Sequence, residues 1–388
     1  MDSITSASRV NTCGLRARAA PMMGVRMFED LRAAASGGWE LLVRRDELTA
    51  ATARPVSEPP LADGEVRLAV ERFALSMNTV TYARLGESEL PFWEAFPAPP
   101  GYGRVPVWAF VRVTGSRAEG VPVGGRYFGF VPMASHHTVA AAATARGFAD
   151  ASAERAFLPP WYQTFQRVPE PDAFDARRAL FRQIFPASFH LAGFLAAQAG
   201  AGVRSVLVTS ASSLTAIAAA TLLAERGGPP LIGLTSPDRV GFVRDLGCYG
   251  TVLGYGDLPS APVAAPAVLV DFTGEHRRVK EIYDRFPGRF AHTALVGYTH
   301  PDSVQEPPAL TAPEPEIFFT PAVEEQAVAE EGEERYFARY HDAEQRFLES
   351  TTAWLTIRER QGPQAVAEVF SALLTGPQPP GVSFSLTP

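Results

Sequence analysis

The sequence predicts an α/β protein with two domains, a small β-barrel and a doubly wound parallel sheet. Short strand patterns with glycine punctuation fill the chain from about residue 27 to 140. Continuous apolar strands then alternate with helices between residues 189 and 321, a pattern typical of a parallel sheet covered on both faces. A last strand pattern, at residues 382–386, is expected to return to the first domain.

The composition is that of a globular chain. Its 388 residues are 46% hydrophobic and 20% charged, which gives room for two domains of ordinary size. The chain has no run of about 18 apolar residues that would span a membrane. A net charge of −7 argues against a nucleic-acid partner. Two cysteines, Cys13 and Cys248, cannot build a disulfide framework or a structural zinc site, so we expect a cytoplasmic protein.

Residues 1–26 are rich in arginine and contain one acid, Asp2. An Arg-rich targeting peptide is one interpretation, although the segment lacks the apolar core of a secretion signal. We favour the other interpretation, a disordered or mis-started extension, because alternative starts follow at Met22, Met23 and Met27.

Four strand patterns support the barrel. Residues 64–73 alternate with Val66, Leu68 and Val70 on one face, and residues 39–44 also alternate. Glycine punctuates a strand region at 101–113, and a Gly-Gly turn precedes the aromatic strand within 121–131. Many short strands at this spacing favour a small barrel.

Residues 76–87, SMNTVTYARLGE, are polar where a strand would be apolar, and they predict the start of a short helix. One interpretation makes Asn78 or Thr79 the N-cap of that helix. The other makes Asn78, Thr81 and Tyr82 neutral donors that line a pocket.

Residues 146–186 form an expected ordered insertion rich in proline and aromatic residues. A Pro-Pro pair at residues 159 and 160 excludes a continuous helix, and so many rings would not stay in solvent. Core packing and substrate contact are both open for these rings, Tyr162 among them.

Residues 205–239 predict the first βαβ unit of a dinucleotide-binding (Rossmann-type) sheet. The turn after its first strand reads SASSLTA, from Ser210 to Ala216, and contains no glycine. Its small and hydroxyl side chains still allow a compact loop that donates to phosphate. Leu214 departs from this pattern, because such a loop would have a small residue at its position. The leucine side chain could either press on a pyrophosphate or point into the core.

The second strand ends LIGLTSPDR, with hydroxyls at Thr235 and Ser236. Sheets that prefer NADP place neutral and basic groups here for the 2′-phosphate, and Arg239 matches phosphate geometry. An exposed arginine at a helix start is the equally weighted alternative. Asp238 is read as a first-turn acid of the following helix.

The remaining elements complete the sheet and the C-terminal part. We expect a helix at 237–246, strands at 247–255, 266–272 and 293–297, and a helix at 275–286. Eight glutamates between Glu314 and Glu334 indicate a solvated acidic face. Helices at 336–356 and 364–374 then precede the terminal strand.

A resemblance to a known family rests on ordered segments along almost the whole chain after residue 27. The chain resembles the DUF2855 family and, more widely, the zinc-free quinone oxidoreductase and enoyl reductase branch of the medium-chain dehydrogenase/reductase superfamily. These segments read NTVTYARLGE, GRVPVWAF, GGRYFGFVPMASHHTV, LPPWYQTFQR, VLVTSASSLTA, GLTSPDRVGFVRDLGCYG, LVDFTG, ALVGYTH, IFFTP and GVSFSL.

The resemblance implies a GroES-like barrel domain over residues 27–188 and a Rossmann-type cofactor domain over 189–321. Residues 322–388 would be a helical return to the catalytic domain. Relatives often dimerise along the edge of the cofactor sheet, so a homodimer is expected. Zinc-binding members use Cys and His ligands that this chain lacks, and the adjacent His136 and His137 point to opposite faces of a strand, so we expect no metal.

The function expected from the resemblance is a metal-free, NADPH-dependent reductase of a hydrophobic carbonyl or α,β-unsaturated carbonyl compound, including acyl or polyketide-like substrates. Tyr82 would be the catalytic donor, with Asn78, Thr81 and Tyr162 beside it. The alternative is a non-redox lyase, dehydratase or cyclase that pairs Tyr82 with His137 or Tyr162 as acid and base. The expected cofactor-binding residues are Ser210, Ser212, Ser213, Thr215, Thr235, Ser236 and Arg239. The resemblance adds Tyr255 near the adenine, and Thr273, Gly274, Gly297 and Tyr298 near the ribose and nicotinamide.

Overall fold

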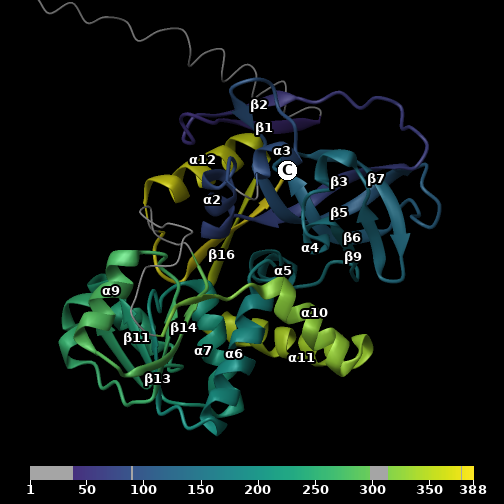
Figure 1. Ribbon diagram of the computed structural model, residues 1–388. Helices are drawn as coiled ribbons and strands as arrows, with labels where there is room; N and C mark the ends of the chain where they lie inside the picture. The colour runs from purple at the N-terminus through teal and green to yellow at the C-terminus, as the bar shows by residue number, and fades with distance from the viewer. Residues whose placement is uncertain (1–37, 89–90, 298–312, 377) are drawn as a thin grey trace, which may run out of the picture.

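A computed structural model describes residues 38–88, 91–297, 313–376 and 378–388. The expected extension at residues 1–26 therefore lies outside the described part. The chain forms a barrel lobe and a sheet lobe, with the C-terminal elements joining them (Figure 1). Within the described residues, no helix is long and apolar enough to cross a membrane.

Six antiparallel strands close the barrel. Their order is β3-β5-β6-β9-β8-β7, and β7 pairs back with β3. The inward face of β3 carries the buried Val66, Leu68 and Val70 that the alternation predicted. The strands are β3 (Glu65–Ala74), β5 (Pro106–Ser116), β6 (Arg126–Pro132), β7 (His136–Thr144), β8 (Gly147–Asp150) and β9 (Thr164–Arg167).

The Pro- and aromatic-rich segment supplies two of these strands, β8 and β9, which the sequence did not predict. Both are only four residues long. At Gly147, φ is +156°, and a Cβ would lie 2.0 Å from the Phe165 carbonyl oxygen, so this close crossing requires glycine. The same segment contains three short helical elements, η1 (Ala153–Arg155), α4 (Pro160–Gln163) and α5 (Asp175–Phe181).

The terminal strand does return to the barrel, as predicted. In β17 (Val382–Thr387), Ser385 and Leu386 pair antiparallel with Ala74 and Phe73 of β3. The prediction of a helix at 336–356 is wrong about where the helix ends, because α11 stops at Ser350. The charged strand β16 (Thr356–Gln361) begins at the expected last residue of the helix and pairs parallel with β17.

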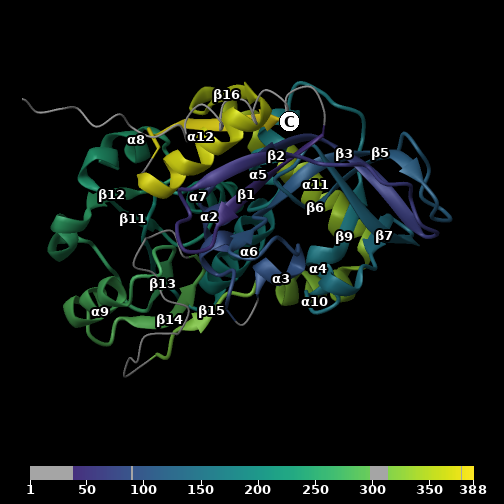
Figure 2. The ribbon, with the colours of Figure 1, turned by 90° about the horizontal axis from the view of Figure 1, so that it is seen from above.

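Smaller elements complete the barrel lobe. A separate three-stranded sheet has the order β2-β1-β4. Helix α12 lies beside α2 in both views of the molecule (Figures 1 and 2). These elements are β1 (Trp39–Arg44), β2 (Ala51–Pro55), β4 (Tyr102–Gly103), α2 (Met77–Arg84), α3 (Phe92–Ala95) and α12 (Gly362–Thr375).

The second lobe is a parallel sheet with the strand order β12-β11-β10-β13-β14-β15. Numbered along the chain, the strands lie in the order 3-2-1-4-5-6, which is the order of dinucleotide-binding sheets. Successive strands are added on one side of β10 as far as β12 and then on its other side from β13 onward, so the order switches between β10 and β13. The strands are β10 (Ser205–Val208), β11 (Leu231–Thr235), β12 (Thr251–Gly254), β13 (Ala267–Asp271), β14 (Phe290–Leu295) and β15 (Glu316–Ile317).

Helices cover both faces of this sheet. Side chains of α6, α7 and α8 share one core cluster with Val206, Val208 and Val268, whereas α9 packs with Leu207 and Leu269 on the other face. The helical elements are α6 (Phe185–Gly200), α7 (Leu214–Arg226), η2 (Pro237–Arg239), α8 (Val240–Asp245), η3 (Tyr255–Ser260) and α9 (His276–Arg285). The fold class predicted from the sequence is thus confirmed.

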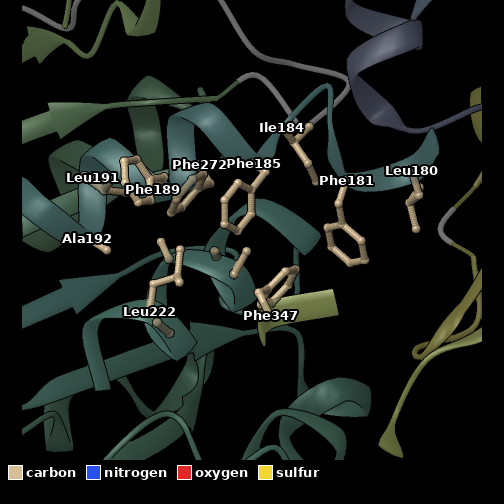
Figure 3. Packing of buried hydrophobic residues seen from close by; sticks show 14 of the residues in the cluster. Leu180, Phe181, Ile184, Phe185, Phe189, Leu191, Ala192, Leu222, Phe272 and Phe347 are labelled. Carbon is tan, nitrogen blue, oxygen red and sulfur yellow. The ribbon is translucent and has the colours of Figure 1, made fainter. Parts of the chain in front are cut away.

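The C-terminal helices α10 (Thr320–Glu331) and α11 (Glu333–Ser350), followed by η4 (Thr351–Ala353), pack beside α6. Phe347 of α11 contacts Phe181 and Phe185, so α11 closes the aromatic core beside α6 (Figure 3). The expected acidic face is mostly exposed, but Glu324 departs from it. Burial raises the pKa of Glu324, which is hydrogen-bonded to Tyr336.

Candidate functional site

A large cavity lies where the two lobes and the C-terminal segment meet. Its volume is about 1710 Å³, larger than the roughly 300–1,000 Å³ typical of a site for one small ligand. One wall is the carboxyl-end edge of β10, β11 and β13, a second is α2 and α4, and a third is the segment from Leu373 to Phe384.

The structure brings almost all the predicted site residues to this cavity. Tyr298 lies outside the described residues, and Gly274 is buried in the turn after β13. The predicted residues that line the cavity are Asn78, Thr81, Tyr82, Tyr162, Ser210, Ser212, Ser213, Thr215, Thr235, Ser236, Arg239, Tyr255, Thr273 and Gly297.

The turn after β10 leads directly into α7. Ser213 caps the helix, because its hydroxyl accepts from the backbone N–H of Ala216 over 3.3 Å. The N–H groups of Leu214 and Thr215, in the first turn of α7, have no acceptor within the helix. Since both residues line the cavity, the positive end of the α7 dipole is available to an anion there.

Several amides of this turn are already used. Ser210 has a φ of +48°, and it is the only non-glycine residue with positive φ in the described part of the chain. Its N–H donates to the Tyr255 hydroxyl over 2.8 Å. The N–H groups of Ala211 and Ser213 donate to the carbonyls of Leu234 and Ser210, over 2.9 and 2.8 Å. The turn therefore offers fewer free amides than a glycine-rich loop.

Leu214 combines the two placements considered from the sequence. Its half-buried side chain packs against the core around α6 and α7, and it also lines the cavity. Leu214 thus narrows the cavity beside the turn while it remains anchored in the core.

A buried hydrogen-bond network joins the two strands at the reversal point. Thr209 donates from Oγ1 to Oδ1 of Asp271 over 2.5 Å. Asp271 also accepts from the Thr273 hydroxyl at 2.8 Å and the Gly274 N–H at 2.9 Å. Burial raises the pKa of Asp271. The network fixes the turn that presents Thr273 to the cavity. It was not predicted from the sequence, although polar residues at strand ends were its signal: Thr209 follows the apolar strand β10, and Asp271 is the last residue of the apolar strand β13.

Arg239 is mostly buried rather than exposed at a helix start. Its side chain is 17% exposed, it lines the cavity, and its guanidinium donates to the carbonyl oxygen of Gln378 over 2.5 Å. The nearest carboxylate oxygen belongs to Asp238 and lies 4.0 Å away. On the same strand end, Thr235 donates to the Ser212 hydroxyl over 3.0 Å.

Tyr82 faces these groups from α2. Its buried hydroxyl oxygen accepts from Asn78 Nδ2 over 2.9 Å and from Trp108 Nε1 over 3.0 Å. Both lone pairs are then occupied, so the O–H of Tyr82 is left to donate elsewhere. Burial raises the pKa of Tyr82 well above its ordinary value. Trp108 was not predicted as part of the site, because only the fold brings β5 beside α2.

The helix that carries Tyr82 begins differently from the prediction. Its N-cap is Ser76, not Asn78 or Thr79, since the Asn78 N–H donates to the Ser76 hydroxyl over 3.2 Å. Thr79 instead completes the capping box with its side chain. The Thr81 hydroxyl donates to the Met77 carbonyl over 3.0 Å, so its proton is engaged within the helix.

Tyr162 reaches the cavity from α4. Its ring meets those of Tyr82 and Phe92 edge-on, with centroid distances of 6.3 and 5.7 Å. Burial raises the pKa of Tyr162 to about 12. The aromatic segment therefore serves both purposes considered from the sequence, core packing and cavity lining.

The two adjacent histidines lie apart from this site. His136 Nδ1 lies 3.0 Å from the Ser135 hydroxyl, and the His137 ring packs edge-on against Phe96. Neither lines the cavity, and burial holds the pKa of His137 well below its ordinary range. Among the described residues, no group of three or more His, Cys, Asp or Glu side chains is placed to hold a metal ion.

Solved structures share this fold at low sequence identity. CurA from Vibrio vulnificus, in complex with NADPH, has a TM-score of 0.61 and 11% identity, over 90% of this chain and 98% of CurA. The yhdH oxidoreductase from Salmonella enterica, in complex with NADP, has a TM-score of 0.53 and 15% identity, over 90% of this chain and 99% of its own. A mutant form of enoyl thioester reductase from Candida tropicalis has a TM-score of 0.53 and 11% identity, over 90% of this chain and 99% of its own.

These similarities confirm a GroES-like barrel combined with a Rossmann-type sheet. A search of the curated proteins gives no match. The family model described as "Protein of unknown function (DUF2855)" matches residues 73–378, which is more than half of the sequence. The chain therefore belongs to the DUF2855 family.

Proposed function

We propose that this protein is a metal-free, NADPH-dependent reductase of an apolar carbonyl or α,β-unsaturated carbonyl compound, including acyl or polyketide-like substrates. One observation carries the proposal. Tyr82, whose hydroxyl oxygen accepts from two N–H donors, lines the same cavity as the carboxyl ends of a sheet in the dinucleotide-binding order. Solved structures of this fold contain NADPH or NADP.

The residues of the sheet wall fit a dinucleotide. Ser212, Ser213 and Thr215 offer hydroxyls beside the positive end of α7, which suits a pyrophosphate. Thr235, Ser236 and Arg239 would hold the 2′-phosphate. Thr273 and Gly297 would face the ribose and nicotinamide, and a Cβ at Gly297 would come within 3.1 Å of the Phe272 carbonyl oxygen.

The barrel wall supplies the donor for the reaction. The chemistry that NADPH would supply when bound is a hydride for the electrophilic carbon. The Tyr82 O–H would donate to the carbonyl oxygen of the substrate and stabilise the negative charge that develops on it. Asn78 and Trp108 hold the phenol oxygen so that its proton is directed away from them. Burial keeps this phenol neutral by raising its pKa, so it remains a donor at physiological pH.

The substrate end of the cavity is apolar. Beside Tyr82, the wall contains Met77, Leu85, Phe92 and Trp161, with Phe92 only 2% exposed. These side chains would bind hydrocarbon and exclude water from the reacting carbon. The apolar part of this lining supports a hydrophobic carbonyl substrate, and Arg84 of α2 adds a positive charge to the same wall.

The non-redox alternative needs an acid and a base in the cavity. Of the three residues named for this alternative, His137 does not line the cavity, which leaves Tyr82 and Tyr162. Burial raises the pKa of both phenols, so neither would serve as a base near neutral pH. This observation favours the reductase.

A dimer along the sheet edge is part of the proposal. Ile317 on the edge strand β15 and Phe319, two residues further along, are 51% and 47% exposed, and both also line the cavity. Covering these side chains in a second copy would remove apolar surface from water. Light scattering of the wild type and of Ile317→Glu would test the interface, since a monomeric wild type would contradict it.

Cofactor titration tests the proposed function directly. Nicotinamide fluorescence is followed while the purified protein is titrated with NADPH and, separately, with NADH. We expect NADPH to bind more tightly than NADH, and reduction of an apolar enone to consume NADPH. Activity should survive dialysis against a metal chelator. Absence of any binding at millimolar NADPH would overturn the proposal.

A further inference from the structure

We propose that Tyr255 and Arg278 form the pyrophosphate-binding element of this site and replace the missing glycines of the turn. This inference rests on the proposed function. It assigns two arginines on the sheet side of the cavity to different phosphates, Arg278 to the pyrophosphate and Arg239 to the 2′-phosphate.

The turn itself explains why another donor is needed. In a glycine-rich loop, backbone amides approach the pyrophosphate directly. Here the N–H of Ser210 points to Tyr255, and those of Ala211 and Ser213 donate to backbone carbonyls. Three amides of the turn are therefore unavailable to a ligand, and side chains must supply the missing hydrogen bonds.

Tyr255 can supply one of these hydrogen bonds, because it accepts from the turn and can donate its own O–H to a ligand. Its hydroxyl oxygen accepts from Ser210 at the start of the turn, and the residue lines the cavity. A phenol that accepts in this way still has its own O–H to donate. Burial raises the pKa of Tyr255 to about 12, so the hydroxyl keeps its proton at neutral pH.

Arg278 adds the positive charge. Its guanidinium carbon lies 3.8 Å from the centre of the Tyr255 ring, and its side chain is 18% exposed and lines the cavity. The terminal nitrogens lie 3.6 and 3.8 Å from the carboxylates of Glu275 and Glu281. In contrast, Nε is buried and has no hydrogen-bond partner among the residues that the structure describes. A buried, unpaired N–H of a cation is costly, so an acceptor at this position is expected.

The sheet topology separates the two arginines. Arg239 follows β11, whereas Arg278 belongs to α9 after β13, and its guanidinium lies on the ring of Tyr255, which accepts from the turn of β10. The pyrophosphate belongs at the start of α7, beside the turn and Tyr255. The 2′-phosphate belongs at the end of the second strand, where Arg239 lies. Arg278 should consequently bind a group that NADPH and NADH share, whereas Arg239 should bind one that only NADPH has.

Binding measurements on Arg278→Gln separate these roles. Dissociation constants are measured by calorimetry for NADPH, NADH and adenosine 2′,5′-bisphosphate, which has no pyrophosphate. We expect Arg278→Gln to raise the dissociation constants of NADPH and NADH by the same factor, about ten- to a hundred-fold, because a charged hydrogen bond is lost. Binding of the bisphosphate should change far less.

Two further variants keep the test decisive. Arg277→Gln is the matched control, because Arg277 is the preceding residue on α9 and is 83% exposed; it should bind all three ligands like the wild type. Arg278→Lys retains the charge that Glu275 and Glu281 contact but lacks the planar Nε–H. It should fold like the wild type, with the same melting temperature, and still lose affinity for both dinucleotides.

The outcomes distinguish this inference from the proposed function. A wild type that binds neither dinucleotide would contradict the proposed function itself. A wild type that binds NADPH, with Arg278→Gln and Arg278→Lys binding as tightly, would overturn only the role of Arg278. A loss confined to NADPH would also overturn it, because that result assigns Arg278 to the 2′-phosphate.

Discussion

The indole N–H of Trp108 donates to the hydroxyl oxygen of Tyr82 over 3.0 Å. Asn78, four residues before Tyr82 on α2, donates to the same oxygen over 2.9 Å. Two residues from different elements thus occupy both lone pairs of one phenol. The remaining O–H becomes an obligatory donor, and the predictions for the barrel wall follow from this arrangement.

Removing the Tyr82 hydroxyl should affect the reaction rather than cofactor binding. Tyr82→Phe keeps the ring contacts with Phe92 and Phe130 but deletes the donor. We expect kcat for the reduction of an apolar enone to fall about 10²- to 10³-fold, the usual cost of an oxyanion donor. The Kd of NADPH should change less than two-fold. Tyr162→Phe is the control, and an equal loss of kcat there would contradict the role of Tyr82.

Removing the Trp108 donor should have a smaller effect of the same kind. In Trp108→Phe, one lone pair of the Tyr82 oxygen is released, and the O–H can turn away from the substrate. We expect kcat to fall about five- to ten-fold, with KM for the substrate nearly unchanged. Trp93→Phe removes another buried indole that has no contact with Tyr82 and controls for lost packing. If kcat is the same in the two variants, the hydrogen bond has no role in the reaction.

The pH profile should stay level on its alkaline side. Burial raises the pKa of Tyr82, and raises that of Tyr162 to about 12, so both hydroxyls remain protonated well above neutrality. Because the proposed donor is the protonated phenol, activity is lost only when pH rises through the raised pKa. We expect no loss of kcat between about pH 7 and 9. A decline in this range that disappears in Tyr82→Phe would contradict the assignment.

Arg239 should determine cofactor preference. Arg239→Gln removes the guanidinium proposed to bind the 2′-phosphate, so the Kd of NADPH should rise about ten- to a hundred-fold. The Kd of NADH should remain the same. Arg244→Gln, an exposed arginine on the adjacent helix α8, serves as the control. Equal losses for NADPH and NADH would indicate that Arg239 acts through its contact with Gln378 instead.

Asp271 should matter for stability. In Asp271→Ala, the donors at Thr209, Thr273 and Gly274 lose a fully buried acceptor. We expect the free energy of unfolding to fall by about 2–4 kcal/mol in denaturant titrations. Asp284→Ala breaks an exposed pair with Lys280 and should cost less than about 0.5 kcal/mol. Similar losses in the two variants would show that the network adds no stability.

Three of the strands that the sequence missed, β8, β9 and β16, have a physical reason in common. β8 and β9 have four residues each and sit among prolines and aromatic rings, so no period-2 pattern can develop. β16, with the sequence TIRERQ, is a charged strand at the edge of its sheet, where neither face is buried. Such strands form because a neighbour accepts their hydrogen bonds. For β9 and β16 these neighbours are β6 and β17, which are distant in the sequence, whereas β8 forms a hairpin with β7.

The sequence alone determined the order of the parts. Apolar periodicity and turn residues are local signals, and they were enough to predict the barrel, the parallel sheet, the returning strand and the polar residues at the strand ends. The same signals drew attention to the glycine-free turn from Ser210 to Ala216.

The tertiary structure decided how those residues act. Trp108 meets Tyr82, Tyr255 meets Ser210, and Thr209 meets Asp271 through contacts between elements 26 to 62 residues apart. Hydrogen-bond direction depends on the positions of both partners, and a local pattern specifies only one of them. The chain order could therefore indicate which groups gather at the cavity, while only the folded structure shows which protons remain free to reach a ligand.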